Sequence, residues 1–343
     1  MFLMNMLCPI INNDFGKLVE RVFNECRVPF RNSKYSNHVY SNFVHVYCLV
    51  YKERLNVSYR RFERIAKDLQ LNRLLAVKSV PHFSTLQKFL QRMQKDLFRK
   101  LVRVCHKLLK LKNLQCSIDS TGISLTNPSA HYLKRVDSVK VKNFTKTSLN
   151  VENNHKIILD IQTHTERCHD TKDFIPLLKN LCSVSLVLAD KAYDSTKNLK
   201  YVLEELKAEP QIPVRQWKQQ RYKYGFKPLV HGKLRRKMLE EFDEKKYSKR
   251  NIVESINSAL KRTLGSWVCS RKPKNQEKQV IIKALAYNLE IITVKGLLKI
   301  KALFLCFRTG ILQSQRSQKV FKPKELNYTN HVTKKNLFFS CIN

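Results

Sequence analysis

The spacing of apolar and polar residues along the chain changes near residue 110. Before that point apolar residues mostly recur at helical intervals. The segment from Ser84 onward begins with a capping-box pair, Ser84 and Gln87, and keeps the helical period through Leu97. Residues 58–70 form another short amphipathic segment, whose basic side chains are predicted to be exposed at Arg60, Arg61, Arg64 and Lys67. Residues 1–110 are therefore predicted to be a helical region.

The role of this helical region has two interpretations. Two short helices around residues 71–83 fit a helix-turn-helix-like DNA reader, a motif that is only weakly marked in sequence. They fit equally well a plain helical bundle whose basic faces meet solvent. We assign residues 1–110 to DNA binding or dimerisation, and the choice between the two interpretations stays open.

Beyond residue 110 strand-like patterns appear. Strands are predicted where apolar and polar residues alternate or where a short apolar run occurs, at residues 114–125, 147–152, 156–165, 184–190 and 210–214. Helical periodicity is found at residues 170–181, 193–207 and 247–262. Meandering strands followed by alternating helices and strands predict a mixed α/β domain over residues 111–296. The pattern dissolves into a basic tail at residues 297–343, to which we assign no role.

Net charge is the unusual feature of the composition. The 343 residues include 65 Lys and Arg but 27 Asp and Glu, a formal net charge of +38 at pH 7. Such a chain attracts polyanions through counterion release, so nucleic acid is the expected partner. An anionic membrane surface or an acidic protein is the weaker alternative. With seven glycines in the chain, a glycine-rich phosphate loop is not expected, and a phosphate site must use side chains and metal ions.

The cysteines indicate the compartment. Ten cysteines are scattered without a Cys-x-x-Cys pair, and neither a secretory signal nor a bilayer-spanning apolar segment is recognised. These features predict free thiols in the cytoplasm, with the chain associated with the nucleoid and with no membrane partner. His155, His164, Cys168 and His169 could suggest zinc, but their spacing fits no standard zinc finger, so zinc is not expected. No cysteine has the context of a nucleophile.

Three carboxylates stand at positions that suggest chemistry. Asp119 interrupts a strand pattern and Asp190 directly follows an apolar strand, where an ionised group is costly unless it is paired or binds a cation. Each alone could be a turn or capping residue. Together with Glu254 on the helix at 247–262 they form a candidate cluster for hard divalent cations. One strip of that helix, either a solvated face or the wall of a site, carries Tyr247, Arg250, Glu254, Asn257 and Lys261.

The order Asp119, Asp190, Glu254 on strand, strand and helix resembles the DDE transposases of prokaryotic insertion sequences. "SIDSTGI" looks like the first Asp motif of that family, and "LADKAYDS" is similar to the second, with Ala192 where Gly is common. Tyr247, Arg250, Glu254 and Lys261 match the Tyr-x2-Arg-x3-Glu-x6-Lys signature of one large transposase group. The resemblance covers residues 115–292 and does not reach the tail.

This resemblance implies a ribonuclease-H-like α/β fold, a mixed-sheet catalytic core preceded by the helical domain. It implies an endonuclease and polynucleotidyl transferase in which Asp119, Asp190 and Glu254 hold two Mg²⁺ ions, which Mn²⁺ can replace. The enzyme is expected to bind the terminal inverted repeats of an insertion sequence and cut the element end. The freed 3′-OH then attacks target DNA, which completes DNA transposition. A homodimer on DNA is expected because two ends must be joined.

Further residues are predicted to contact DNA. The resemblance places Tyr247, Arg250 and Lys261 near the cleaved phosphodiester. Residues 215–237 carry nine Lys and Arg and no acid, and they include Arg215 and Trp217. Basic and aromatic residues together suit a strand end with unstacked bases, and a solvated basic loop is the alternative. Another basic stretch, predicted to face DNA between two strands, contains Lys134 and Arg135.

Two other interpretations use the same residues. A metal-dependent nuclease of the same fold would need the same three carboxylates but would not join strands. A decayed transposase would bind DNA through its charge and helices without cutting it. A joining assay separates the first alternative from a transposase, and replacement of Glu254 separates the second.

Overall fold

The computed structural model of the chain describes residues 14–31, 39–125, 144–166, 168–215, 221–222, 225–226, 230 and 232–294. The described residues up to Val294 belong to one compact unit. Lys134, Arg135 and Trp217 lie outside the described residues, as does the tail predicted at 297–343. No helix in the described part of the chain is long and apolar enough to cross a membrane.

A mixed sheet is the scaffold of the second half of the described chain. Its five strands are β1 (Leu114–Ser124), β2 (Phe144–Glu152), β3 (Ile157–His164), β4 (Val184–Ala189) and β5 (Glu209–Gln211). Their order is β3-β2-β1-β4-β5, with β2 antiparallel to β1 and β3, and with β4 parallel to β1 and β5. This order and these directions are those of the ribonuclease-H-like fold, so the predicted fold class is confirmed. A separate short ladder pairs β6 (Arg221–Tyr222) with β7 (Gly225–Phe226).

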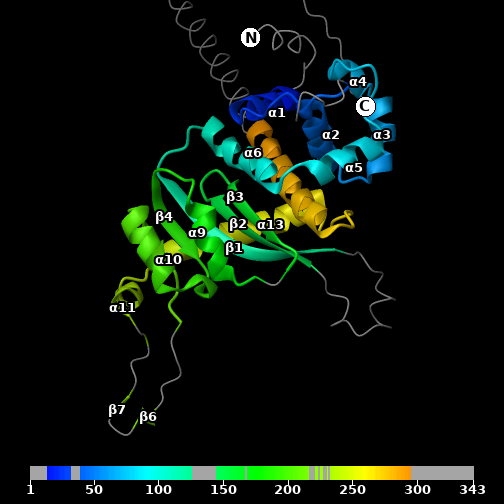
Figure 1. Cartoon of the computed structure of the whole chain (residues 1–343). Coiled ribbons are helices and arrows are strands. Elements are labelled where there is room, and N and C mark those ends of the chain that lie inside the picture. The colour runs from blue at the N-terminus through cyan, green and yellow to red at the C-terminus, as the bar shows by residue number, and fades with distance from the viewer. Residues whose placement is uncertain are drawn as a thin grey trace, which may run out of the picture. The chain divides into compact units, whose positions relative to one another are not determined.

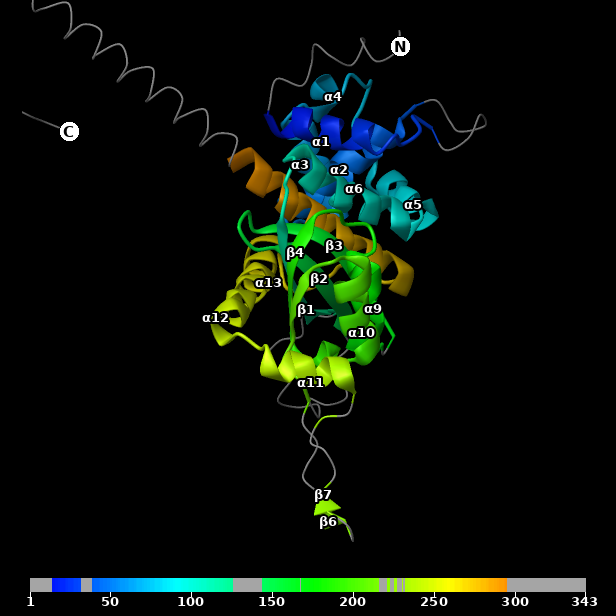
Figure 2. The ribbon, with the colours of Figure 1, turned by 90° about the vertical axis from the view of Figure 1, so that its left-hand side faces the viewer.

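Helices cover both faces of the sheet (Figures 1 and 2). One face carries α9 (Asp170–Leu178), the 3₁₀ turn η1 (Lys191–Tyr193), α10 (Thr196–Lys200) and the π-helical turn η2 (Tyr201–Glu205). The other face carries a helical run of α12 (Glu244–Tyr247), the 3₁₀ turn η3 (Ser248–Arg250) and α13 (Asn251–Leu264). The helical spacing predicts an apolar stripe of Ile252, Ile256, Ala259 and Leu260, of which Ile256 and Leu260 are buried and the other two partly buried. Val253 is buried as well. Because both faces are covered, β4 is apolar along nearly its whole length.

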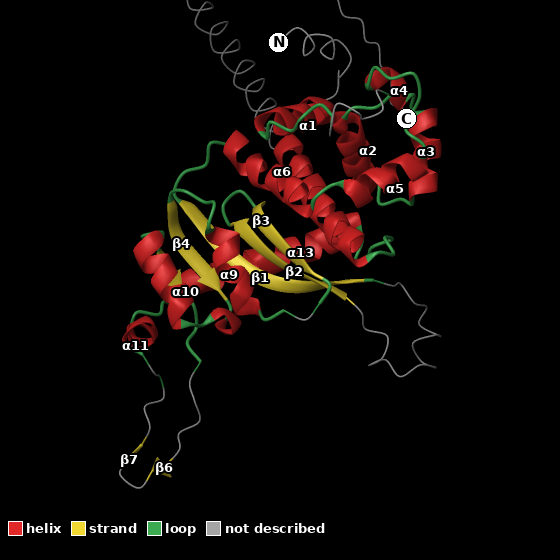
Figure 3. Cartoon of the chain, in the orientation of Figure 1, coloured by secondary structure: helices red, strands yellow, loops and turns green. Residues whose placement is uncertain are grey.

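Helices make up the described residues before β1 (Figure 3). They are α1 (Asp14–Glu25), α2 (Asn42–Arg54), α3 (Tyr59–Asp68), the single turn α4 (Leu71–Leu74), α5 (Phe83–Arg92) and α6 (Lys95–Leu108). The basic side chains predicted to be exposed on α3 are exposed. A helix over residues 273–294 contacts both this region and the sheet, since Arg54 binds Glu290 and Asn288 hydrogen-bonds to Ile158. One continuous hydrophobic core therefore spans the helical region and the sheet.

The single helix predicted from Ser84 onward is two helices in the structure. α5 begins at Phe83, and its N-terminal cap is the side chain of His82 rather than Ser84. Met93 then takes an extended backbone conformation, with a ψ of 145°, before α6 begins. The predicted continuity of the helix and its predicted capping residue are therefore both wrong.

Tertiary contacts explain this break, because no Gly or Pro interrupts residues 84–108. The ammonium group of Lys278, in the helix over 273–294, donates to the carbonyl oxygen of Leu90 at 2.8 Å. It thereby satisfies a group that the end of α5 leaves unpaired. After the break, α6 lies against β3, where Arg99 and Asp160 form a buried ion pair. These contacts outweigh the local helical period.

The basic stretch at residues 215–237, for which no helix is predicted, ends in helix α11 (Lys233–Glu240). The helix follows Gly232, whose φ of 93° lies in the region that glycine adopts most readily. Arg235 in its first turn forms an ion pair with the buried carboxylate of Asp194. This pairing joins residues far apart in sequence, which is why the local pattern of basic residues does not predict the helix.

Candidate active site

The register of the sheet brings Asp119 and Asp190 to neighbouring positions. β1 runs parallel to β4, and Ile118 on β1 pairs with Ala189 on β4. Asp119 and Asp190 are the next residues after this pair, so the two carboxylates lie side by side where β4 ends. Asp190 begins η1, and its Oδ1 accepts a hydrogen bond from the backbone N–H of Lys191 at 2.6 Å.

Glu254 reaches the same place from the first turn of α13. Its Oε1 accepts a hydrogen bond from Nη2 of Arg250 at 2.6 Å, and Nη1 of that guanidinium lies 3.5 Å from Oδ1 of Asp119. One turn later, Nδ2 of Asn257 donates to Oδ2 of Asp119 at 3.2 Å. The helix thus brings the third carboxylate next to the strand that carries the first. The Glu254 side chain stays 53% exposed, which leaves it open to a ligand.

The two ends of the predicted strip also face this place. Nζ of Lys261 donates to Oγ1 of Thr121 on β1 at 2.6 Å. The guanidinium carbon of Arg250 lies 5.8 Å from the centre of the Tyr247 ring. The strip from Tyr247 to Lys261 is therefore turned toward β1, and the alternative of a fully solvated helix face does not hold.

Burial and neighbouring charges shift several pKa values here. Burial, the largest cause, raises the pKa of Asp119, and the charges of Glu254 and Asp190 raise it further, while Arg250 and a backbone hydrogen bond lower it. Burial lowers the pKa of the Lys261 ammonium group, and the charge of Asp119 partly offsets that effect. Burial likewise raises the pKa of Tyr247. Glu254 and Asp190 therefore disfavour the charged form of Asp119, and additional positive charge near Asp119 would favour it.

The donor set fits a divalent cation. Asp119, Asp190 and Glu254 offer carboxylate oxygens, the ligands that Mg²⁺ and Mn²⁺ prefer. Two buried polar atoms beside them, Nη1 of Arg250 and Oδ1 of Asn257, have no hydrogen-bond partner among the described residues. A buried donor and a buried acceptor left unpaired at one site are expected where a ligand completes the bonding. The site can therefore hold cations through its carboxylates and an anionic group through Arg250.

A chain of hydrogen bonds links residues that are close in sequence to the two aspartates. The Tyr193 hydroxyl lies 2.7 Å from Oγ of Ser120, and Ser120 lies 2.8 Å from Oγ of Ser148. Ser148 in turn donates to Oδ2 of Asp173 at 2.7 Å. Ser120 directly follows Asp119, and Tyr193 lies in η1, which Asp190 begins. No role is predicted for these residues from the sequence, although Ser120 and Tyr193 lie within the two Asp motifs, "SIDSTGI" and "LADKAYDS".

The remaining predicted DNA contacts have mixed outcomes. Arg215 is exposed, and its Nε donates to the carbonyl oxygen of Lys191 in η1 at 3.0 Å. Its position beside the turn that follows Asp190 is compatible with the predicted contact to DNA. Trp217, Lys134 and Arg135 lie outside the described residues, so their contacts stay predictions.

The histidines and cysteine weighed for zinc separate in the structure. His155 pairs with Glu152, and His169 caps α9 by accepting a hydrogen bond from the backbone of Thr171. His164 and Cys168, by contrast, come together, and they do so with a carboxylate that the spacing argument did not include. The four residues therefore do not form a zinc finger, but two of them, His164 and Cys168, lie close together.

Comparisons with known proteins give a family match for about half of the chain. The family profile described as "Transposase DDE domain" matches residues 112–289. None of the curated proteins matches the chain. Among solved structures, the chain is similar to the cryo-EM structure of the piggyBac transposase synaptic complex with hairpin DNA (SNHP). That similarity has a TM-score of 0.40 and 12% sequence identity, and it covers 84% of this chain and 74% of the other.

Proposed function

The chain belongs to the transposase DDE domain family, and from this premise we propose that Asp119, Asp190 and Glu254 are its catalytic carboxylates. The chain is a transposase, that is, a DDE-type polynucleotidyl transferase and endonuclease. The observation that carries the assignment is the convergence of the three side chains. Two follow a paired position of neighbouring parallel strands, and the third is linked to Asp119 through Arg250.

DDE transposases use divalent metal ions. We propose that here the ions are two Mg²⁺, held by Asp119, Asp190 and Glu254. Such ions activate water and stabilise the leaving oxygen in phosphodiester cleavage. The raised pKa of Asp119 supports this proposal, because burial and two neighbouring carboxylates disfavour its ionised form until positive charge is added.

The other residues of the strip position the carboxylates and the DNA backbone. Asn257 orients Asp119 by donating to one of its oxygens. Arg250 bridges Asp119 and Glu254, and its buried Nη1, which makes an ion pair with Asp119 but no hydrogen bond to the described residues, can donate to a phosphate oxygen. Tyr247 and Lys261, before and after Glu254 on the same helical run, are proposed to contact the phosphates on either side of the cleaved bond.

The proposed reaction consists of two displacements at phosphorus. In the first, water adds to the phosphorus at an element end, the bond to the 3′-oxygen breaks, and that oxygen takes up a proton. In the second, the resulting 3′-OH adds to a phosphorus of target DNA, and a target 3′-oxygen leaves. One phosphodiester forms for each one that breaks in the second step, so no external energy source is required.

The DNA partner is supported by charge. With a formal net charge of +38, the chain attracts the phosphate backbone strongly. The exposed basic face of α3 and the basic residues around Arg215 are the proposed contacts to the terminal inverted repeats and target DNA. We propose a homodimer on DNA, since two element ends must be brought together.

The test is cleavage and joining of a labelled duplex that carries the inverted repeats flanking the coding sequence. Wild type and Glu254→Gln are compared with Mg²⁺, with Mn²⁺ and without metal. We expect metal-dependent 3′-end cleavage and joining in the wild type. Glu254→Gln should lower the rates of cleavage and joining by more than roughly a hundredfold, because loss of an outer-shell partner of a metal already costs up to about that much. DNA binding should be kept.

Glu244→Gln is the matched control, because Glu244 is exposed and lies on the same helical run. It should cleave and join like the wild type. Cleavage that survives in Glu254→Gln would overturn the assignment of Glu254. Cleavage without joining by the wild type would indicate a nuclease of this fold, and binding without cleavage by every variant would indicate a relic.

A further inference from the structure

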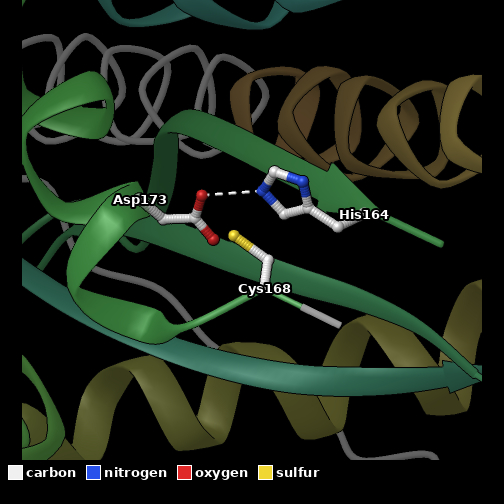
Figure 4. Close-up of side chains that lie close together, drawn as sticks. All are labelled: His164, Cys168 and Asp173. Atoms are coloured by element: carbon white, nitrogen blue, oxygen red, sulfur yellow. Dashed lines mark hydrogen bonds and ion pairs between the residues drawn. The ribbon is translucent and has the colours of Figure 1, made fainter. Parts of the chain in front are cut away.

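A second cluster of metal-ligating side chains lies outside the candidate active site. His164 at the end of β3, Cys168 in the following loop and Asp173 on α9 point toward one another (Figure 4). A ligand atom from each lies within 4.8 Å of the other two. Nε2 of His164 is 2.7 Å from Oδ1 of Asp173. Three different ligand types thus meet across a short stretch of chain.

The chemistry of this cluster differs from that of the active site. A thiolate and an imidazole suit Zn²⁺, whereas Mg²⁺ prefers oxygen ligands alone. Cys168 is a free cysteine of intermediate exposure, and the His164 side chain is 28% exposed. An ion can therefore reach them from solvent. The cluster has the donor set of a zinc site with three protein ligands, which leaves the fourth tetrahedral position to water.

The surroundings hold the carboxylate in place as the outer shell of a metal site does. Asp173 is buried, and its Oδ2 accepts a hydrogen bond from Ser148 at 2.7 Å, which leaves Oδ1 on the side of His164. The hydrogen bond from Ser148 fixes the orientation of the carboxylate without using the oxygen that faces His164.

Lys146 does not exclude a cation from this place. Its Nζ lies 2.7 Å from Asp170 and 3.7 Å from Oδ2 of Asp173, on the oxygen away from His164. A Zn²⁺ ion bound by one thiolate, one carboxylate and a neutral imidazole forms a group without net charge. The ammonium group of Lys146 is thus not repelled by the loaded site.

We propose that His164, Cys168 and Asp173 bind a zinc ion that ties the end of β3 to the start of α9. Zinc bonds of about 2.0–2.1 Å separate two ligand atoms by about 3.3 Å, so the contact of His164 with Asp173 would open by roughly 0.6 Å. The Cys168 sulfur moves inward to complete the site and gives up its proton. The ion is separate from the carboxylate site, and by binding the folded chain it stabilises the junction of β3 and α9.

The experiment uses the full chain with Zn²⁺ and with Co²⁺ as its spectroscopic substitute. After removal of loosely held metal, we expect about one zinc ion per chain that depends on Cys168. Co²⁺ should give a thiolate charge-transfer band in the near ultraviolet, which oxygen ligands alone cannot produce. Cys168→Ser and His164→Gln should each weaken zinc binding by roughly tenfold or more and remove the band or shift it. Zinc should raise the thermal midpoint of the wild type but not that of Cys168→Ser.

Two variants serve as matched controls. Cys182→Ser replaces an exposed cysteine outside the cluster, and Asp119→Asn alters the carboxylate site. Both should keep the thiolate band and the zinc that depends on Cys168. Circular dichroism confirms that each variant is folded. The proposal would be overturned by a Co²⁺ spectrum without a thiolate band, or by zinc binding in Cys168→Ser equal to that of the wild type. In that case His164 and Asp173 only hydrogen-bond to each other and bind no metal.

Discussion

The ion pair between α6 and β3 allows a sharp test of how the helical region is joined to the sheet. Nε and Nη2 of Arg99 donate to the two carboxylate oxygens of Asp160 at 2.7 and 2.6 Å. Nε of Arg103 lies 3.0 Å from Oδ2 of Asp160, without the geometry of a hydrogen bond. Asp160 is 1% exposed and Arg99 8%, so the pair is shielded from water. Asp160→Asn keeps the shape of the side chain and removes its charge.

The cost can be worked out from these contacts. Removing one partner of a buried ion pair costs about 3–5 kcal/mol, because the other charge is left uncompensated. Arg99 keeps a hydrogen bond to the carbonyl oxygen of Pro176, and the Arg103 side chain, at 24% exposure, can turn toward water. The lower end, about 3 kcal/mol in the free energy of unfolding, is therefore expected. At roughly 2 °C per kcal/mol for a chain of this size, the thermal midpoint should fall by about 6 °C.

Urea unfolding followed by circular dichroism measures this change. The midpoint of Asp160→Asn should fall while the slope stays the same, and one transition should move as a whole because the two regions share a core. Asp68→Asn, at the exposed end of α3, is the control and should stay within about 0.5 kcal/mol of the wild type. A loss below about 1 kcal/mol in Asp160→Asn would refute the argument that the pair is desolvated.

Three further outcomes are expected. Tyr193→Phe removes the hydroxyl that contacts Ser120, so it should cost about 1–2 kcal/mol of stability and slow DNA cleavage without weakening DNA binding; unchanged cleavage would contradict a supporting role. Lys261→Met should lower the slope of log binding constant against log salt by about one, as measured by fluorescence anisotropy, and an unchanged slope would exclude a phosphate contact. Burial, with help from Lys107, lowers the pKa of His106 to about 4, below its ordinary 6.5. The unfolded chain then binds a proton that the folded chain does not, so stability should fall as the pH drops from 6.5 toward 4, by at most about 3 kcal/mol, and His106→Gln should flatten that fall in pH-dependent unfolding.

Local patterns in the sequence determined the elements of the catalytic core. Alternation within residues 114–125 and the apolar run at 184–190 are enough to predict β1 and β4. The burial of one or both faces of a strand determines which consecutive residues are apolar, so it can be read locally. Within α13, the common direction of Glu254, Asn257 and Lys261 likewise follows from the 100° turn per residue of a helix, whereas a 3₁₀ turn separates Tyr247 from α13. The three carboxylates and their order can be read from the sequence, and the resemblance of their motifs to known transposases indicated the family that the profile match shows.

Only the tertiary structure decided which side chains meet. The pairing of Ile118 with Ala189 makes Asp119 and Asp190 neighbours, and no local pattern contains a register between strands. The break between α5 and α6 depends in the same way on Lys278, which lies far along the chain.

For the same reason, sequence spacing does not predict the hydrogen bonds that link Tyr193 and Ser120. It also does not predict that His164, Cys168 and Asp173 come together. Periodicity records which face of one segment is buried. The contacts between segments depend on the packing of the whole core, and the periodicity of one segment contains no information about that packing.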